Sequence, residues 1–215
     1  MTSNCPLCLS DKIKEKLNAE KPFPAKYYHC SVCELTFIGR EYLLNQSTEK
    51  SRYDFHENNI EDAGYTNFLN RLIAPTKNFI TSSDIGLDYG SGPEPVLAEL
   101  MQRDGFKVDI FDPIYAKKSI EKSYDFITST EVIEHFHEPR KSFDHMLSLL
   151  NSNGVLALMT SILNDSIDFK NWSYRYDDTH VSFYSNETFI WLANHYKLEL
   201  IHSEKNVRIF RKITS

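Results

Sequence analysis

The sequence predicts an α/β protein with a mostly parallel sheet that is closed by a C-terminal antiparallel hairpin and preceded by a small cysteine-rich unit. Three observations support this fold class. From residue 84 onward, short apolar runs alternate with helical segments, the order typical of a parallel sheet covered on both faces. Near the C-terminus, two strand-like runs are separated only by Glu204–Asn206, a connection that requires antiparallel pairing. All four cysteines lie within the first 33 residues.

Length and composition limit the classes of protein that the chain can represent. With 215 residues, it fits one α/β domain plus an appendage, and we expect three parts, residues 1–40, 41–80 and 81–215. No run of 18 apolar residues and no signal-like start occur, so we expect a cytoplasmic protein without a membrane segment. The net charge of −6 argues against a broad phosphate-binding surface, which makes nucleic acid an unlikely partner.

The cysteines form two C-x-x-C pairs separated by 21 residues. Thiolates at this spacing favour a tetrahedral zinc site, with a pair of redox dithiols or two disulfides as the alternatives. Four thiolates would fill the coordination shell, so the site would be structural and closed. We therefore predict that residues 1–40 form a zinc ribbon. The predicted metal ligands are Cys5, Cys8, Cys30 and Cys33.

Residues 41–80 have aromatic and aliphatic side chains at helical spacing with charges between them. The pattern predicts two or three helices, broken near Asn58-Asn59 and Ala74-Pro75. Tyr53 and His56 make the segment unusually aromatic and polar for a linker. It is either a capping helix with a turn, or a lid that folds over a ligand.

The first strand of the larger part, Ile85–Tyr89, leads into a glycine turn. Asp88 ends the apolar run, and Gly90 and Gly92 follow with one residue between them. A helix over Pro95–Arg103 comes next, and prolines suit a first helical turn. This layout brings bare backbone close to a ligand at a helix N-terminus.

The following strands predict a sheet that is shortened at one position. The second predicted strand is Lys107–Phe111, and Asp112 follows it directly. The next predicted strand is Tyr124–Thr128. Only eleven residues separate Asp112 from Tyr124, too few for a helix, a strand and a second helix. The remaining predicted elements are a helix Ser142–Leu150, a strand Val155–Met159, a helix Phe189–Tyr196 capped by Ser185, and hairpin strands Lys197–Ser203 and Val207–Arg211.

Two motifs resemble the class I S-adenosylmethionine-dependent methyltransferases. D-Y-G-S-G at 88–92 is similar to their motif I, D/E-x-G-x-G, and E-V-I-E-H at 131–135 is similar to the segment after their fourth strand. The resemblance covers about residues 84–213. It implies a Rossmann-like methyltransferase sheet, shortened around strand 3, in residues 81–215, with S-adenosylmethionine as cofactor.

The resemblance also implies a set of cofactor-binding residues. In the family, an acidic residue at the position of Asp112 accepts hydrogen bonds from both ribose hydroxyls; the alternative for Asp112 is a cap for the turn before Pro113. Because the third strand must be vestigial or missing, no residue is assigned to the adenine. The implied set is Asp88, Tyr89, Gly90, Ser91, Gly92, Asp112, Pro113, Thr130 and Glu131.

A four-cysteine ribbon before this fold resembles the sugar C-methyltransferases of deoxysugar pathways. D-T-H-V-S-F-Y-S at 178–185 is similar to their late E-H-x-x-x-x-S segment, in which a Glu-His pair lies near the substrate. His180 matches the histidine, while Thr179 replaces the glutamate. His180 is the best candidate base, with His135 and His56 as second choices. The alternative for His180 is a buried structural histidine.

The resemblance favours one activity over two others. It implies transfer of the sulfonium methyl group to a small-molecule metabolite. The first alternative is an RNA methyltransferase whose zinc ribbon docks nucleic acid, and the second is a non-catalytic zinc-ribbon interaction protein. The sequence indicates neither the methyl acceptor nor whether carbon, nitrogen or oxygen is methylated.

Overall fold

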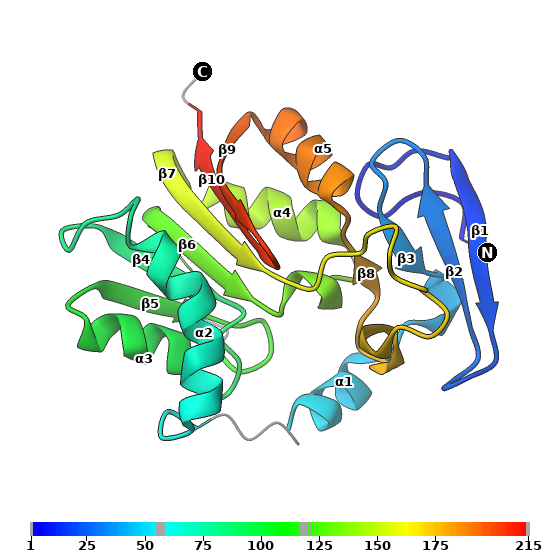
Figure 1. Cartoon of the computed structure of the whole chain (residues 1–215), viewed down its shortest axis with the longest axis horizontal. Helices are drawn as coiled ribbons and strands as arrows, with labels where there is room; N and C mark the ends of the chain where they lie inside the picture. Colours follow the sequence, from blue (N-terminus) through cyan, green and yellow to red (C-terminus); the bar gives the residue numbers. More distant parts are fainter. Residues whose placement is uncertain (1, 55–58, 117–119, 121, 214–215) are drawn as a thin grey trace.

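The computed structural model describes residues 2–54, 59–116, 120 and 122–213. A six-stranded sheet forms the centre of the larger part, and a four-stranded sheet lies beside it at the N-terminal end (Figure 1). None of the helices in the described residues is long and apolar enough to span a membrane.

The six-stranded sheet has the order β5-β4-β6-β7-β10-β9. The first four of these strands pair in parallel, and β10 runs antiparallel to both of its neighbours. This confirms the predicted parallel sheet with a C-terminal hairpin. The strands are β4 Ile85–Tyr89, β5 Lys107–Phe111, β6 Tyr124–Thr130, β7 Leu150–Met159, β9 Leu198–Glu204 and β10 Val207–Lys212.

Strand β5 is the edge of this sheet. After it, Asp112 and Ala116 form an isolated bridge, and among the described residues no strand lies between that bridge and β6. The shortening predicted from the short Asp112–Tyr124 spacing is therefore present.

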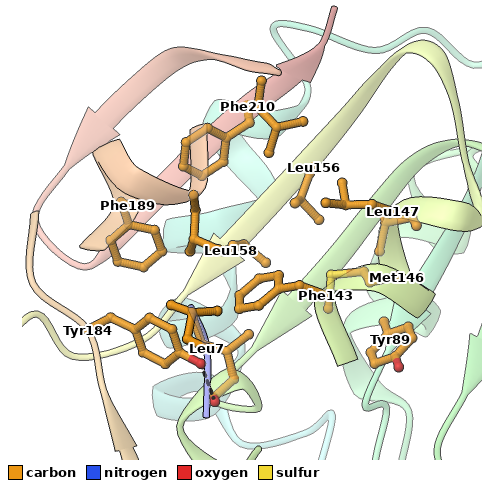
Figure 2. Packing of buried hydrophobic residues seen from close by; sticks show 14 of the residues in the cluster. Leu7, Tyr89, Phe143, Met146, Leu147, Leu156, Leu158, Tyr184, Phe189 and Phe210 are labelled. Atoms are coloured by element: carbon orange, nitrogen blue, oxygen red, sulfur yellow. Dashed lines mark hydrogen bonds between the residues drawn. The ribbon is translucent and has the colours of Figure 1, made fainter. Parts of the chain in front are cut away.

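Helices cover both faces of the sheet. Alternate residues of a strand point to opposite faces, so both faces carry apolar side chains that the helices bury. Leu156 and Leu158 of β7 belong to the cluster that packs against α4 and α5 (Figure 2), while Val155 and Ala157 belong to the cluster under α2 and α3. Each buried large apolar side chain contributes about 1.5–3 kcal/mol to stability. The helices are α2 Ala63–Thr76, α3 Val96–Arg103, α4 Pro139–Ser148 and α5 Asn186–Tyr196.

The four-stranded sheet joins the N-terminal cysteine unit to the second half of the chain. Its antiparallel order is β1-β2-β3-β8, so a strand from beyond residue 180 completes it. Arg175 is 1% exposed and donates hydrogen bonds to the carbonyl of Lys21 and toward the hydroxyl of Tyr27, across the same junction. The strands are β1 Ile13–Ala19, β2 Ala25–Cys30, β3 Thr36–Ile38 and β8 Ser182–Phe183.

The segment between the two sheets is helical, as the periodicity predicts. A 3-10 turn over Arg40–Tyr42 precedes α1, Gln46–Tyr53, which Asn45 caps. Helix α2 passes through Pro75 and ends one residue later. Of the other predicted break, Asn58 lies outside the described residues, and Asn59 lies ahead of α2.

Candidate functional site

A cavity of about 860 Å³ opens at the carboxyl ends of β4, β5 and β6, where ligands bind in open α/β sheets. Its walls come from the glycine turn, the end of β5, the loop after β6, helices α1 and α2, and the loop that contains His180. All predicted cofactor-binding residues except Asp88 line it, as do His135 and His180. His56 lies outside the described residues.

Glycine is needed at the two positions of the turn for different reasons. Both have positive φ, +83° at Gly90 and +67° at Gly92, which favours glycine. A Cβ atom at Gly90 would lie 2.4 Å from Cγ1 of Val132, whereas one at Gly92 would meet nothing within 4 Å. Gly90 therefore permits packing behind the turn, and Gly92 leaves backbone exposed to the cavity.

Asp88 supports the turn and does not line the cavity. Its side chain is 4% exposed and accepts a hydrogen bond of 3.2 Å from the Thr128 hydroxyl. Burial raises the pKa of Asp88 to about 7, although the bonds from Thr128 and the Ala98 backbone oppose the shift. The carboxyl group therefore lies between the sheet and α3.

Asp112 caps the turn that follows β5 and also borders the cavity. Its Oδ1 accepts hydrogen bonds from the backbone N–H groups of Ile114 (2.7 Å) and Tyr115 (2.9 Å), which caps the turn. Its Oδ2 accepts one from the N–H of Gly92 at 3.0 Å and lies beside the glycine turn. A carboxylate oxygen has two acceptor sites, so Oδ2 can accept a further bond from a ligand in the cavity.

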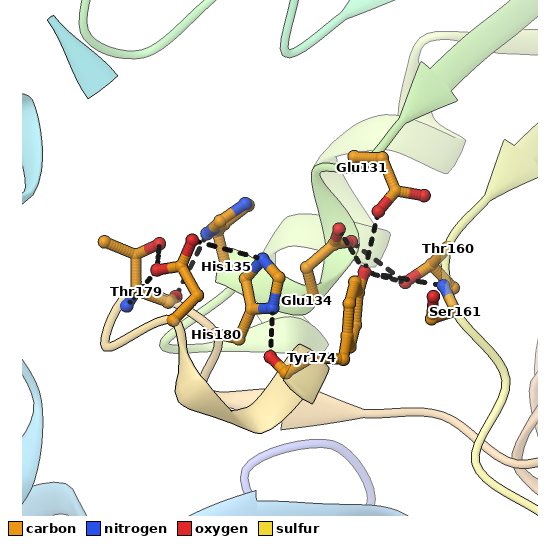
Figure 3. A network of polar contacts seen from close by, with 9 residues as sticks. Glu131, Glu134, His135, Thr160, Ser161, Tyr174, Thr179 and His180 are labelled. Atoms are coloured by element: carbon orange, nitrogen blue, oxygen red, sulfur yellow. Dashed lines mark hydrogen bonds and ion pairs between the residues drawn. The ribbon is translucent and has the colours of Figure 1, made fainter. Parts of the chain in front are cut away.

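His135 and His180 lie side by side, with ring centroids 4.8 Å apart (Figure 3). Nδ1 of His135 lies 3.0 Å from the carbonyl oxygen of Thr179, and Nδ1 of His180 lies 2.7 Å from that of Tyr174. A carbonyl oxygen only accepts, so each neutral ring carries its proton on Nδ1 and its basic lone pair on Nε2. The backbone thus selects one tautomer for both histidines.

Asp177 follows the short 3-10 helix Ser173–Tyr176 and faces His180. Its Oδ2 lies 3.8 Å from Nε2 of His180, and its Oδ1 accepts bonds from the N–H and hydroxyl of Thr179. Burial opposes ionisation of this carboxyl, but the Thr179 bonds and the nearby histidines hold the pKa of Asp177 below its ordinary value. Asp177 is therefore an anion beside the His180 ring.

An acidic pair lies on the other side of His180. Tyr174 places its hydroxyl 3.0 Å from Oε2 of Glu131 and 2.5 Å from Oε1 of Glu134, while the Thr160 hydroxyl donates to Glu134 at 3.0 Å (Figure 3). Burial raises the pKa of both carboxyl groups, and the charge of Glu134 raises that of Glu131 further. Among the residues that the structure describes, hydroxyl groups and not cations contact this pair.

Several residues that line the cavity are not among the predicted site residues. Tyr53 of α1 contacts the His135 ring with centroids 5.3 Å apart, and Tyr65 and Phe68 of α2 form an aromatic wall. His137 bonds to Glu49 across the mouth at 2.8 Å. The aromatic content of residues 41–80 was the available signal, but helical spacing alone does not show which face meets the cavity.

The four cysteines are free and cluster away from this cavity. Sγ of Cys5 lies 3.4 Å from that of Cys33, and the same distance separates Cys8 from Cys30. These distances are far longer than a disulfide bond of about 2.05 Å. All four sulfur atoms lie within 4.8 Å of one another, which is compatible with a tetrahedral metal site.

Comparison with known protein families shows which family the chain belongs to. The model of a methyltransferase domain family matches residues 59–203. The chain belongs to this family. The match confirms the prediction of a methyltransferase domain, and the mixed sheet agrees with the Rossmann-like methyltransferase fold. None of the curated proteins compared with this methyltransferase matches it in sequence.

Comparison with solved structures finds similarity at low sequence identity. Human N-acetylserotonin methyltransferase in complex with S-adenosylmethionine has 15% identity and a TM-score of 0.52, over 77% of this methyltransferase and 57% of that chain. An O-methyltransferase family protein from Burkholderia thailandensis has 13% identity and a TM-score of 0.49, over 78% and 63%. The N-methyltransferase NodS from Bradyrhizobium japonicum, in complex with S-adenosylhomocysteine, has 14% identity and a TM-score of 0.49, over 77% of this methyltransferase and 97% of that chain. The methyltransferase thus spans less than two thirds of the first two chains.

Proposed function

We propose that the protein transfers the methyl group of S-adenosylmethionine to a small-molecule acceptor in the described cavity. One observation carries this proposal: the exposed backbone of Gly92, the Asp112 carboxylate and the histidine pair line the same cavity. The glycine turn and Asp112 suit a nucleoside-type cofactor, and the histidines suit an acceptor that must lose a proton. The aromatic wall of α2 adds an apolar surface.

The residues that would hold the cofactor come from three strand ends. Gly90 to Gly92 allow close approach of backbone, and Asp112 has acceptor capacity for ribose hydroxyls. Tyr89, Ser91 and Pro113, together with Thr130 and Glu131 after β6, would complete the set, while Asp88 would support it from behind. The cofactor supplies an electrophilic methyl group, so the protein has to align the acceptor and manage its proton.

His180 is the proposed general base. The Tyr174 carbonyl keeps the proton on Nδ1, so Nε2 is the atom that accepts the acceptor's proton as the methyl group is transferred. Asp177, 3.8 Å from Nε2, stabilises the imidazolium that results. His135 lies beside it in the same tautomer and would orient the acceptor. His56 stays a predicted second choice.

We further propose that the four cysteines bind one structural Zn²⁺. The cluster is closed, and its ribbon strand β3 pairs with β8, which begins two residues after His180. Phe37 and Ser182 are partners in this pairing. The metal would therefore stabilise the ribbon and, through it, the segment that carries the base. This gives the ribbon a structural part in the site.

The variant His180→Ala tests the proposal. Loss of the base should lower kcat by about 10²- to 10⁴-fold while the affinity for S-adenosylhomocysteine stays unchanged. His195→Ala removes an exposed histidine on α5 and should leave both values as in the wild type. Methyl transfer to a panel of small acceptors is followed as S-adenosylhomocysteine release. Equal turnover of the His180 variant and the wild type would assign His180 a structural role instead.

A further inference from the structure

We propose that Glu134, His135 and His180 form a second metal site, which takes a divalent transition-metal ion with nitrogen and oxygen ligands. One ligand atom from each of these residues lies within 4.8 Å of the other two. Two imidazoles and a carboxylate are donors that Zn²⁺ and Co²⁺ bind well. His135 and His180 line the cavity described above, while Glu134 is fully buried. The cysteine cluster is a separate group of different chemistry.

The contacts around the histidines are those that orient metal ligands. Metal-binding imidazoles nearly always donate their other N–H to a carbonyl or carboxylate, which fixes the ring and directs its lone pair. Here the carbonyls of Thr179 and Tyr174 accept from Nδ1 of His135 and His180, at 3.0 and 2.7 Å. The coordinating atom of each ring is therefore Nε2, already in the tautomer that binds a cation.

The carboxylate of the site is equally well oriented. Glu134 is fully buried, and hydroxyl groups of Tyr174 and Thr160 donate to its two oxygens. In the part of the chain that the structure describes, no lysine or arginine forms an ion pair with Glu134 or with Glu131. Buried carboxylates normally pair with a cation, and a metal ion bound by Glu134 would serve as one.

The metal would share its ligand atoms with the proposed chemistry. A coordinated ion occupies the lone pair of Nε2 on His180, and the same atom cannot then accept the acceptor's proton. Excess transition metal should therefore inhibit methyl transfer in competition with the acceptor. This consequence rests on the proposed function, whereas the site itself does not.

Titration with Co²⁺ tests the site without any need for turnover. The full-length protein, isolated with its cysteine-bound zinc, is titrated with Co²⁺, and its visible spectrum and metal content are measured after desalting. We expect about one added cobalt per chain, with d–d bands and no sulfur-to-cobalt charge-transfer band, because the ligands are nitrogen and oxygen. A titration with S-adenosylhomocysteine on the same sample reports separately whether the cofactor site is intact.

The variants decide whether these residues hold the ion. His135→Ala and His180→Ala should each lose the added cobalt, whereas His195→Ala should retain it. The exposed position of His195 on α5 makes it a matched control. Absence of added cobalt in the wild type, cobalt with a sulfur charge-transfer band only, or equal cobalt binding by both cavity variants and the wild type would each overturn the proposal. Bound S-adenosylhomocysteine with no cobalt would overturn the metal site alone.

Discussion

At the scale of the residue, burial separates acidic groups that the sequence assigns to a single set. Asp88 and Asp112 both follow apolar strand residues in the expected order. The structure directs Asp88 toward Thr128 and α3, whereas Asp112 borders the cavity. The motif locates both residues but does not show which side chain faces a ligand, because that depends on strand direction and on packing against α3.

The buried carboxyl of Asp88 should make stability depend on pH. Its pKa is raised from 3.8 to about 7 in the folded state, so folding favours the protonated form, and stability is lost as pH rises from about 4 to about 7. The Asp88→Asn variant does not have this loss. Its free energy of unfolding should therefore rise relative to that of the wild type by about 2–4 kcal/mol between pH 4 and pH 8, at about 1.4 kcal/mol per pKa unit. Urea unfolding across this range measures it. The stability of the exposed control Asp165→Asn should change with pH as that of the wild type does. If the free energy of unfolding of Asp88→Asn also ran parallel to that of the wild type, this would contradict the raised pKa of Asp88.

At the scale of the element, a strand was predictable where an acidic residue marks the end of an apolar run, and it was not where only its pairing with another strand defines it. The bounds of β4 and β5 agree with their predictions, because each is a short strand with an acidic residue beside its end, Asp88 in β4 and Asp112 after β5. Residues near Leu150 were predicted as a helix end, but β7 begins there because Leu150 pairs with Tyr124. The two-residue strand β8 has no periodicity to detect, since it exists only through its pairing with β3.

The glycine turn allows a prediction that separates folding from binding. Gly90→Ala places a Cβ 2.4 Å from Val132 and should lower the free energy of unfolding by about 2 kcal/mol or more. Gly92→Ala meets open space, so its cost should be about 1–2 kcal/mol of backbone strain, together with a clear loss of S-adenosylhomocysteine affinity. Denaturation and calorimetry on both variants measure this. The reverse order of stabilities would show that Val132 does not limit the turn.

At the scale of the whole molecule, the cysteine unit and the methyltransferase sheet are joined through the segment that carries His180. The pairing of β3 with β8 and the contacts of Arg175 with the ribbon connect residues far apart in sequence. A single sequence showed each part through its own motif, C-x-x-C or D-x-G-x-G. It did not show how the two parts contact each other, because neither a two-residue strand nor one buried arginine has a local sequence pattern. The division at residues 40 and 80 stays a prediction.

Loss of the zinc that we propose the cysteines bind should therefore loosen the His180 segment. Cys8→Ser should lose about one zinc per chain, and amide hydrogen exchange should rise in β2, β3 and residues 178–184 while β4 and β5 stay protected. Elemental analysis and hydrogen exchange with mass spectrometry measure both effects. Ser31→Ala, an exposed change in the second C-x-x-C loop, should retain the metal and the exchange pattern. Unchanged exchange in residues 178–184 after metal loss would show that the ribbon and the site are independent.

We propose that this cavity binds the methyl donor through the glycine turn and Asp112. Calorimetric titration of the wild type and of Asp112→Ala with S-adenosylhomocysteine tests it most directly, with Asp165→Ala as an exposed control. We expect one ligand per wild-type chain and a loss of about 1.5–3 kcal/mol in the Asp112 variant, the value of a hydrogen bond to a charged group. Failure of the wild type to bind, or equal affinity in the wild type and the Asp112 variant, would contradict the claim.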